Sequence, residues 1–363
     1  MESYIRGEGH SGTGTLLEPL SYLYEAGVRT RLGLYRAGAL RPKSLPCKVI
    51  SVGNITAGGS GKTPLAMYVA RYLMKRGARV VIISRGYGGS LKGTAIVSNG
   101  SDDGGILLGP GEAGDEPVLM AHRLKGVPVV LGADRYAAGL LAIKEFSPRV
   151  IILDDGFQHI RLARDLNILL VDGSLPLSGA RLLPAGPLRE PVSACRRADL
   201  VLVKGGSLND RDKELLSGYG IQSTGFVYTP SGATDLATGE TLTLAELKQT
   251  PLLGIAGIAR PKSFFTTLQG QGLKVVGTIS YGDHHPYGAE DMSSMREKMK
   301  TCGAAALITT EKDGVKLAAL VKGSDVTCYA LSIDVVLKEK SVFRRAMAPF
   351  TEGAAPRGKG EGS

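Results

Sequence analysis

The segment GNITAGGSGKTP, residues 53–64, places a cluster of glycines directly before a Gly-Lys-Thr tripeptide (61–63). The residues before it, KVISVGN (48–54), form a short apolar run typical of a buried strand. Those after it, TPLAMYVARYLMKRG (63–77), have the apolar spacing of a helix and end at a glycine. A strand, a glycine-rich loop and a helix in this order predict a phosphate-binding loop (P-loop), whose backbone N–H groups surround a phosphate.

The predicted loop departs from the generic P-loop pattern at one position. That pattern has Gly or Ala five residues before Gly61, and this chain has Thr56 there. The flanking strand and helix still favour a P-loop over an ordinary glycine turn. Lys62 would reach the β- and γ-phosphates of ATP, and the Thr63 hydroxyl would bind Mg²⁺. The residues expected to bind the nucleotide are Thr56, Ala57, Gly58, Gly59, Ser60, Gly61, Lys62 and Thr63.

Apolar strands alternate with helices along the rest of the chain. The runs 78–89, 149–159, 167–173 and 198–205 are rich in Val, Ile and Leu. This alternation predicts an α/β fold with a P-loop NTPase-like, mostly parallel sheet and helices on both faces. The turn-rich segment 225–244 predicts a β-hairpin connector to a smaller second α/β lobe.

Changes of composition along the chain set the predicted domain boundaries. Strands late in the chain can return to the first sheet, so we expect residues 305–345 to complete the first lobe. The predicted regions are a basic amphipathic, membrane-associating helix region (1–45), a P-loop domain (46–215), a smaller α/β lobe (216–304) and a disordered Gly/Lys/Glu-rich tail (356–363).

The chain has 363 residues and a formal net charge of +10, from 44 Lys and Arg against 34 Asp and Glu. This charge indicates an anionic partner. No helix-turn-helix, zinc-finger or RNA-recognition pattern points to nucleic acid, and no feature indicates an obligate protein partner. Cys47, Cys195, Cys302 and Cys328 lack the spacing of a zinc site or a disulfide framework. We expect neither a signal peptide nor a membrane-spanning segment.

Residues 16–40 combine apolar residues at helical spacing with a basic end. Leu16, Leu20 and Leu23 recur every three or four residues, and four arginines follow between residues 29 and 41. Such a helix can lie among lipid headgroups, where each arginine near anionic lipid contributes on the order of 1 kcal/mol. A helix packed on the protein's own core is the alternative.

Two motifs supply carboxylates. In VIILDDGFQH (150–159), Asp154 ends an apolar strand, where the acid that binds Mg²⁺ lies in P-loop folds. Asp155 is a second candidate, and an Asx turn is the alternative. In GDEP (114–117), Asp115 either caps a helix or accepts a hydroxyl proton as a general base.

Three loops carry further candidates. YGDHHPYGAED (281–291) places two histidines beside Asp283, where they are either an acid–base group or ordinary surface residues. The Pro/Gly-rich loop 181–191 can hold Arg181 and Arg189 against a phosphate, or serve only as a connector. The segment TTEKDGVKL (309–317) follows a strand and is a candidate for a position near the nucleotide base.

In their order along the chain, these motifs resemble those of the tetraacyldisaccharide 4'-kinase family of the lipid A pathway of Gram-negative bacteria. The resemblance covers nearly the whole chain, from about residue 16 to residue 341, and Thr at position 56 is typical of the family's loop. The matching motifs are GNITAGGSGKTP (53–64), SRGYGG (84–89), GDEP (114–117), DDGFQH (154–159), LLPAGPLREP (182–191), GIARP followed by FF (257–265), DHHPY (283–287) and TEKD (310–313).

The resemblance implies an activity and a location. The P-loop domain would be a kinase domain that uses ATP and Mg²⁺ to phosphorylate the 4'-hydroxyl of a tetraacylated glucosamine disaccharide 1-phosphate. The protein would be monotopic on the cytoplasmic face of the bacterial inner membrane, with its N-terminal helix in the lipid surface. Its partners would be this acylated substrate and the membrane surface.

The resemblance also implies roles for particular residues. The family's catalytic base corresponds to Asp115, in partnership with a loop histidine, here His284 with His285 as the alternative. The expected catalytic residues are therefore Asp115, His284 and Lys62, and the expected metal ligands are Thr63 and Asp154, with Glu116 as an additional contributor.

Other classes of P-loop protein are the alternatives. A MinD- or ParA-type membrane-associated ATPase has a lysine just before the double glycine, where this chain has Ala57. A dethiobiotin-synthetase-like ligase fits the P-loop and the α/β pattern, but it does not account for the basic N-terminal segment or for the loop 182–191. A nucleic-acid-binding NTPase fits the charge alone.

Overall fold

The computed structural model describes residues 11–58, 61–101 and 105–351. The predicted disordered tail, 356–363, lies outside the described residues. So do Gly59 and Ser60 of the predicted P-loop, and the first ten residues of the predicted N-terminal region.

The described strands form one sheet. They are β1 (Lys48–Asn54), β2 (Val80–Ser84), β3 (Thr94–Ser98), β4 (Val129–Gly132), β5 (Val150–Asp154), β6 (Leu166–Asp172), β7 (Leu200–Lys204), β8 (Gln222–Asp235), β9 (Thr241–Leu242), β10 (Leu252–Ala256), β11 (Val275–Ser280), β12 (Ala306–Thr310) and β13 (Cys328–Leu337). Their order is β11-β10-β12-β13-β8-β7-β6-β1-β5-β2-β4-β3, and β9 pairs with β8. Among these strands only the pairs β13–β8, β8–β9 and β3–β4 are antiparallel.

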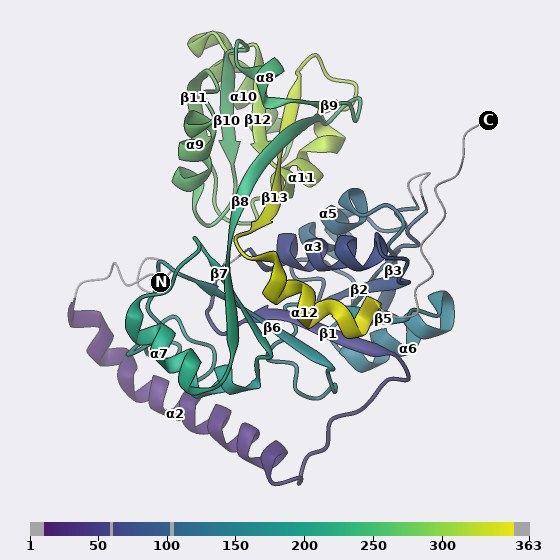
Figure 1. The fold of residues 1–363 in the computed structure, drawn as a ribbon. Coiled ribbons are helices and arrows are strands. Elements are labelled where there is room, and N and C mark those ends of the chain that lie inside the picture. The colour runs from purple at the N-terminus through teal and green to yellow at the C-terminus, as the bar shows by residue number, and fades with distance from the viewer. Residues whose placement is uncertain (1–10, 59–60, 102–104, 352–363) are drawn as a thin grey trace.

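Helices cover both faces of this sheet (Figure 1). They are α2 (Ser11–Arg36), α3 (Lys62–Met74), α4 (Pro110–Ala113), α5 (Asp115–Arg123), α6 (Arg135–Phe146), the 3-10 helix η1 (Val192–Arg197), α7 (Asp210–Gly218), α8 (Leu244–Leu247), α9 (Pro261–Gly270), α10 (Ala289–Cys302), α11 (Glu311–Val321) and α12 (Lys340–Thr351).

Strand β1 shows how the sequence builds both layers. Successive side chains of a strand point to opposite faces. Ile50 packs in the same buried cluster as Leu65 of α3, whereas its neighbour Val49 packs with Ala138 of α6 on the other face. Because both faces are covered, the strand is apolar throughout rather than alternating. The predicted P-loop-like α/β fold with a mostly parallel sheet is confirmed.

Two long strands join the larger lower part of the molecule to the smaller upper part (Figure 1). β8 pairs in parallel with β7 from Gln222 to Phe226, and from Phe226 onward it pairs antiparallel with β13. β13 in turn pairs with β12, which lies beside β10 in the upper part. The expected connector is therefore the β8–β9 hairpin together with β13. We propose that the lobe boundary crosses β8 and β13, because β12 does not return to the strands around β1.

Candidate active site

The P-loop connects β1 to α3 at the carboxyl edge of the sheet. Gly58 and Gly61 have φ angles of 96° and 85°, a left-handed backbone that favours glycine. α3 begins at Lys62, so the N–H groups of its first turn face the loop. The hydroxyl of Tyr228, on β8, donates a hydrogen bond to the Gly61 carbonyl, and a Cβ at position 61 would overlap the Tyr228 side chain. Position 61 therefore requires glycine.

Thr63 and Asp154 meet because β1 and β5 are adjacent parallel strands. The Thr63 hydroxyl donates to Asp154 Oδ2 over 3.5 Å, and the Ser84 hydroxyl donates to the same oxygen over 3.4 Å. Asp154 is 1% exposed, and its other oxygen, Oδ1, has no hydrogen-bond partner among the described residues. Burial, together with the nearby carboxylates of Glu116 and Asp155, raises the pKa of Asp154 to about 7.

These residues fit a bound Mg²⁺ ion. A buried carboxylate with an unpartnered oxygen beside a hydroxyl supplies the oxygen donors that Mg²⁺ prefers. The described part of the chain contains no group of three or more His, Cys, Asp and Glu side chains that could hold a metal. Mg²⁺ bound together with ATP usually takes one or two protein oxygens, with phosphates and water as its other ligands. Glu116 is half-buried and close enough for its charge to act on Asp154.

Lys62 lies beside the carboxylate of Asp155, the residue that follows β5. Its Nζ is 3.6 Å from Asp155 Oδ1, and Arg189 Nη1 is 3.0 Å from Asp155 Oδ2. Burial acts to raise the pKa of Asp155, but the charges of Lys62 and Arg189 outweigh it and hold this pKa below its usual value. Arg189 belongs to the Pro/Gly-rich loop, and its N–H donates to the Ile55 carbonyl over 2.7 Å. That loop therefore packs directly on the P-loop.

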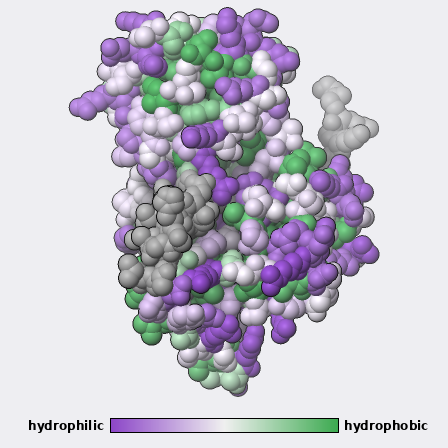
Figure 2. Space-filling model, turned by 90° about the vertical axis from the view of Figure 1, so that its left-hand side faces the viewer, coloured by the Kyte–Doolittle hydropathy of each residue, from purple (hydrophilic) through white to green (hydrophobic). Residues whose placement is uncertain are grey.

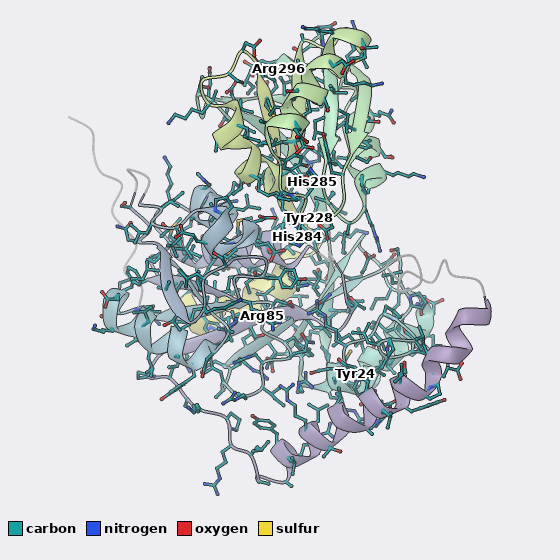
Figure 3. The ribbon with its side chains drawn as sticks, turned by 180° about the vertical axis from the view of Figure 1, so that it is seen from behind. Tyr24, Arg85, Tyr228, His284, His285 and Arg296 are labelled. Carbon is teal, nitrogen blue, oxygen red and sulfur yellow. The ribbon has the colours of Figure 1, made fainter. Side chains whose placement is uncertain are left out.

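Asp115 is the first residue of α5 and is buried. The N-cap of α5 is Gly114, so the alternative prediction that Asp115 caps this helix is wrong. Asp115 Oδ2 lies 3.2 Å from His284 Nδ1 and 3.3 Å from Lys316 Nζ. His284 lies in the loop between β11 and α10, at the junction of the two parts of the molecule (Figure 3).

The two adjacent histidines face different partners. His285 Nε2 lies 3.1 Å from Asp291 Oδ2 at the start of α10. The His285 ring stacks on Tyr281 with 4.4 Å between ring centroids. His284 instead has a φ of 61°, which is rare for residues other than glycine, and its ring contacts Asp115. The geometry therefore favours His284 over His285 as the partner of Asp115.

The TEKD segment (310–313) forms the N-cap and first turn of α11, and its Lys312 contacts the Asp115–His284 pair. Lys312 Nζ lies 3.1 Å from His284 Nε2. The fully buried Asp313 accepts hydrogen bonds from the Gly257 N–H over 2.9 Å and from the Thr310 hydroxyl over 2.8 Å. The segment thus anchors the helix that faces the pair.

Some residues of the site are not predicted from the sequence. Arg135 is 3% exposed and donates to the Gly132 and Asp154 carbonyls, which braces the end of β5. No local sequence pattern predicts that Arg135 lies in the site, or that Tyr228, on a strand far along the chain, contacts the P-loop. Lys316 has one available signal, because it lies four residues after Lys312 and therefore on the same helix face.

A P-loop at the edge of a mostly parallel sheet, with a carboxylate–histidine pair nearby, defines the class as P-loop kinases. A family model described as "Tetraacyldisaccharide-1-P 4'-kinase" matches residues 13–350, and the chain belongs to this family.

Curated relatives and a solved structure agree with this assignment. The chain is 45% identical to the tetraacyldisaccharide 4'-kinase of Geobacter metallireducens, over 92% of this chain and 96% of that protein. It is 47% identical to that of Geobacter sulfurreducens, over 84% and 85% respectively. A crystal structure of LpxK from Aquifex aeolicus, described as in complex with ATP, is similar with a TM-score of 0.76. That structure shares 36% sequence identity and matches 93% of this chain and 99% of its own.

Proposed function

We propose that this protein transfers the γ-phosphate of ATP to the 4'-hydroxyl of a tetraacyl glucosamine disaccharide 1-phosphate in lipid A biosynthesis. The names of the relatives state the type of acceptor and the position phosphorylated, and the related LpxK structure is described as a complex with ATP. The observation that carries the proposal is the Asp115–His284 pair, a buried carboxylate held by a histidine in a P-loop protein. A partitioning ATPase or a ligase would not need such a base for an alcohol.

The P-loop side of the site would bind the nucleotide. Backbone N–H groups of residues 56–63 would surround the phosphates, and Lys62 would neutralise the charge that develops on the transferred group. Thr63 and Asp154 would hold Mg²⁺, with Glu116 nearby. When bound with ATP, Mg²⁺ supplies neutralisation of the β- and γ-phosphate charge. Asp155 would keep Lys62 and Arg189 in place beside the P-loop.

Asp115 would act as the general base. As the substrate oxygen attacks phosphorus, its O–H bond breaks, the proton passes to the Asp115 carboxylate, and the bond from the γ-phosphorus to the bridging oxygen of ADP breaks. His284 would orient the carboxylate through Nδ1. A base placed in this way contributes roughly 10²–10⁴-fold to the rate.

Helix α2 would hold the enzyme at a membrane surface. The Ser21 hydroxyl donates to the Leu182 carbonyl over 2.9 Å, and the Tyr24 hydroxyl donates to the Arg189 carbonyl over 2.8 Å, so one face of α2 is docked beside the active-site loop. Leu20 and Leu23 on another face are 54% and 71% exposed. Figure 2, which views the side where α2 lies, shows apolar side chains exposed toward the lower end of the molecule.

We place the enzyme on the cytoplasmic face of the bacterial inner membrane. Among the described residues, no helix is both long and apolar enough to cross a bilayer. Exposed leucines together with Arg29 and Arg36 on one helix suit binding in the headgroup layer of anionic lipid. The docking of α2 beside Arg189 would bring a membrane-held substrate close to the P-loop.

The test is an assay with labelled ATP, Mg²⁺ and the acylated disaccharide 1-phosphate, followed by thin-layer separation of the lipid products. We expect a bis-phosphorylated lipid that depends on ATP, Mg²⁺ and Asp115. A parallel reaction with DNA in place of lipid should leave ATP hydrolysis unstimulated. ATP turnover without lipid phosphorylation would contradict the proposal and favour a MinD- or ParA-like ATPase or a ligase.

A further inference from the structure

Helix α11 presents two lysines, one helical turn apart, to the two ends of the Asp115–His284 pair. We propose that Lys312 and Lys316 are positioning residues that fix this pair in a single working arrangement. Lys312 supports the Nδ1–H tautomer of His284, which the Asp115 carboxylate also requires, and Lys316 holds one oxygen of Asp115, so that the other oxygen receives the substrate proton. The kinetic part of this inference rests on the proposed role of Asp115 as the base.

The contacts form a continuous chain of alternating charge. Every link joins a cation or an imidazole to an anion, except the link between Lys312 and the imidazole of His284. The distances are 3.0 Å for Asp283 Oδ1–Lys312 Nζ, 3.1 Å for Lys312 Nζ–His284 Nε2, 3.2 Å for His284 Nδ1–Asp115 Oδ2, 3.3 Å for Asp115 Oδ2–Lys316 Nζ and 3.6 Å for Lys316 Nζ–Asp313 Oδ1.

Lys312 and Asp115 act together on the proton of His284, because Lys312 donates to one ring nitrogen and the Asp115 carboxylate accepts from the other. A lysine ammonium has only donors, and that of Lys312 is paired with the Asp283 carboxylate. His284 Nε2 must therefore accept through its lone pair. A neutral imidazole has one N–H, so that N–H is on Nδ1 and donates to Asp115 Oδ2. An imidazolium would instead direct an N–H at the ammonium.

Lys316 decides which oxygen of Asp115 remains for chemistry. Its side chain is 11% exposed and also lies 5.3 Å from the centroid of the Tyr287 ring. It pairs with Asp313, which backbone and hydroxyl donors hold in place. Within the described part of the chain, the polar contacts of Asp115 from His284 and Lys316 both go to Oδ2. The hydroxyl proton therefore goes to Oδ1.

This arrangement limits what His284 can do during the reaction. Its Nδ1 already bears a proton, and its Nε2 faces Lys312. The proton taken from the substrate therefore stays on Asp115 Oδ1, and His284 orients the base without taking up the proton itself. Asp115 and His284 lie 169 positions apart in the chain, and α11 contacts both of them, through Lys316 and Lys312.

The tautomer is measured directly by NMR of ¹⁵N-histidine-labelled protein at about pH 8, where an ordinary imidazole is neutral. Comparison with His284→Gln assigns the His284 signals. We expect a protonated Nδ1 and an unprotonated Nε2 in the unmodified protein and in Lys312→Arg. Lys312→Met should raise the population with a proton on Nε2, because no ammonium then faces that nitrogen, and the matched change Lys322→Met, at the exposed residue that follows α11, should not.

Two spectroscopic results would overturn the role of Lys312. One is an Nε2–H tautomer or an imidazolium in the unmodified protein, and the other is an unchanged His284 spectrum in Lys312→Met. This measurement needs no substrate. Absence of kinase activity alongside the expected tautomer would therefore count against the proposed function and leave the assignment of Lys312 intact.

The role of Lys316 is measured by kinetics. Lys316→Met should lower kcat by about 10-fold or more, part of the contribution of the base, while KM for ATP stays within about twofold. Lys316→Arg should recover most of this loss, because it restores a cation, and Lys322→Met should match the unmodified enzyme. A normal kcat in Lys316→Met would refute the role, as would a loss that Lys316→Arg fails to recover while the variant keeps its unfolding midpoint.

Discussion

Arg123 Nη1 lies 2.6 Å from Glu311 Oε1, and this ion pair joins the end of α5 to the start of α11. The Glu311 side chain is 11% exposed and also accepts a hydrogen bond from the Ser332 hydroxyl over 3.1 Å. Burial raises the pKa of Glu311 despite the Arg123 charge. Because α5 begins with Asp115 and α11 carries Lys316, the pair joins the helix of the proposed base to the helix of its lysine.

Arg123→Met should lower the free energy of unfolding by about 2–4 kcal/mol, because it leaves the Glu311 carboxylate buried without its cation. The double variant Arg123→Met/Glu311→Leu should recover part of this loss, since it removes both charges. Urea denaturation measures the free energy of unfolding of both variants. Arg296→Met is the control, because its ion pair with Asp325 is exposed and should change stability by less than about 1 kcal/mol. Equal losses for Arg123→Met and Arg296→Met would contradict the argument.

Asp115→Asn should lower kcat by about 10²-fold or more, because the amide has a similar shape but cannot accept the hydroxyl proton. Binding of Mg-ATP, measured by calorimetry, should stay within about threefold, since Asp115 lies outside the P-loop. Circular dichroism should report an intact fold. Near-normal turnover would show that another group takes the proton.

Lys62→Ala should reduce kcat/KM by roughly 10²–10³-fold, since it removes the cation expected at the transferred phosphate. Asp155 keeps its second cation, Arg189, so the site should remain folded. Steady-state kinetics measures kcat/KM, and thermal unfolding shows whether the variant is folded. Normal turnover by Lys62→Ala would mean that the phosphates of the nucleotide do not bind beside Lys62.

Asp154 should make the ligand-free protein less stable as pH rises. Its pKa increases from 3.8 to about 7 on folding, so its contribution to stability is present below the unfolded value and is lost as pH rises through 7. Asp154→Asn removes this dependence. Relative to the unmodified protein, the variant should gain on the order of 1–3 kcal/mol in free energy of unfolding between about pH 5 and about pH 8. Parallel stability curves for the two proteins would contradict a buried, ionisable Asp154.

Leu20→Ser/Leu23→Ser should weaken binding to vesicles of anionic lipid by about 10-fold or more, because each buried leucine contributes about 1.5–3 kcal/mol. Stability in solution should change little, since both side chains are exposed. Leu140→Ser, at a 46% exposed leucine on α6, is the matched control and should bind normally. Vesicle sedimentation measures lipid binding by the unmodified protein and by both variants. Equal binding by all the proteins would mean that α2 is not the contact.

The local part of the site follows from the sequence. Gly58 and Gly61 adopt positive φ angles between a buried strand and a helix, as the glycine spacing predicts. Asp154 ends an apolar strand and lies beside Thr63 because parallel strands end at the same edge of the sheet. Short-range periodicity suffices for the P-loop, whose residues are close together in the chain. The contact of Thr63 with Asp154 spans 91 positions, and the sequence predicts it through the general rule that parallel strands end at the same edge of a sheet.

Long-range contacts were decided only by the tertiary structure. The adjacent residues His284 and His285 are indistinguishable by composition, and a single backbone turn with positive φ directs one to Asp115 and the other to Asp291. The approach of Lys316 to Asp115 depends on how α11 packs against α5. Contacts between residues far apart in the chain, such as Asp115 and His284 at 169 positions, leave no pattern in the local sequence. Their free energy comes from burial in the assembled fold rather than from neighbours in the sequence.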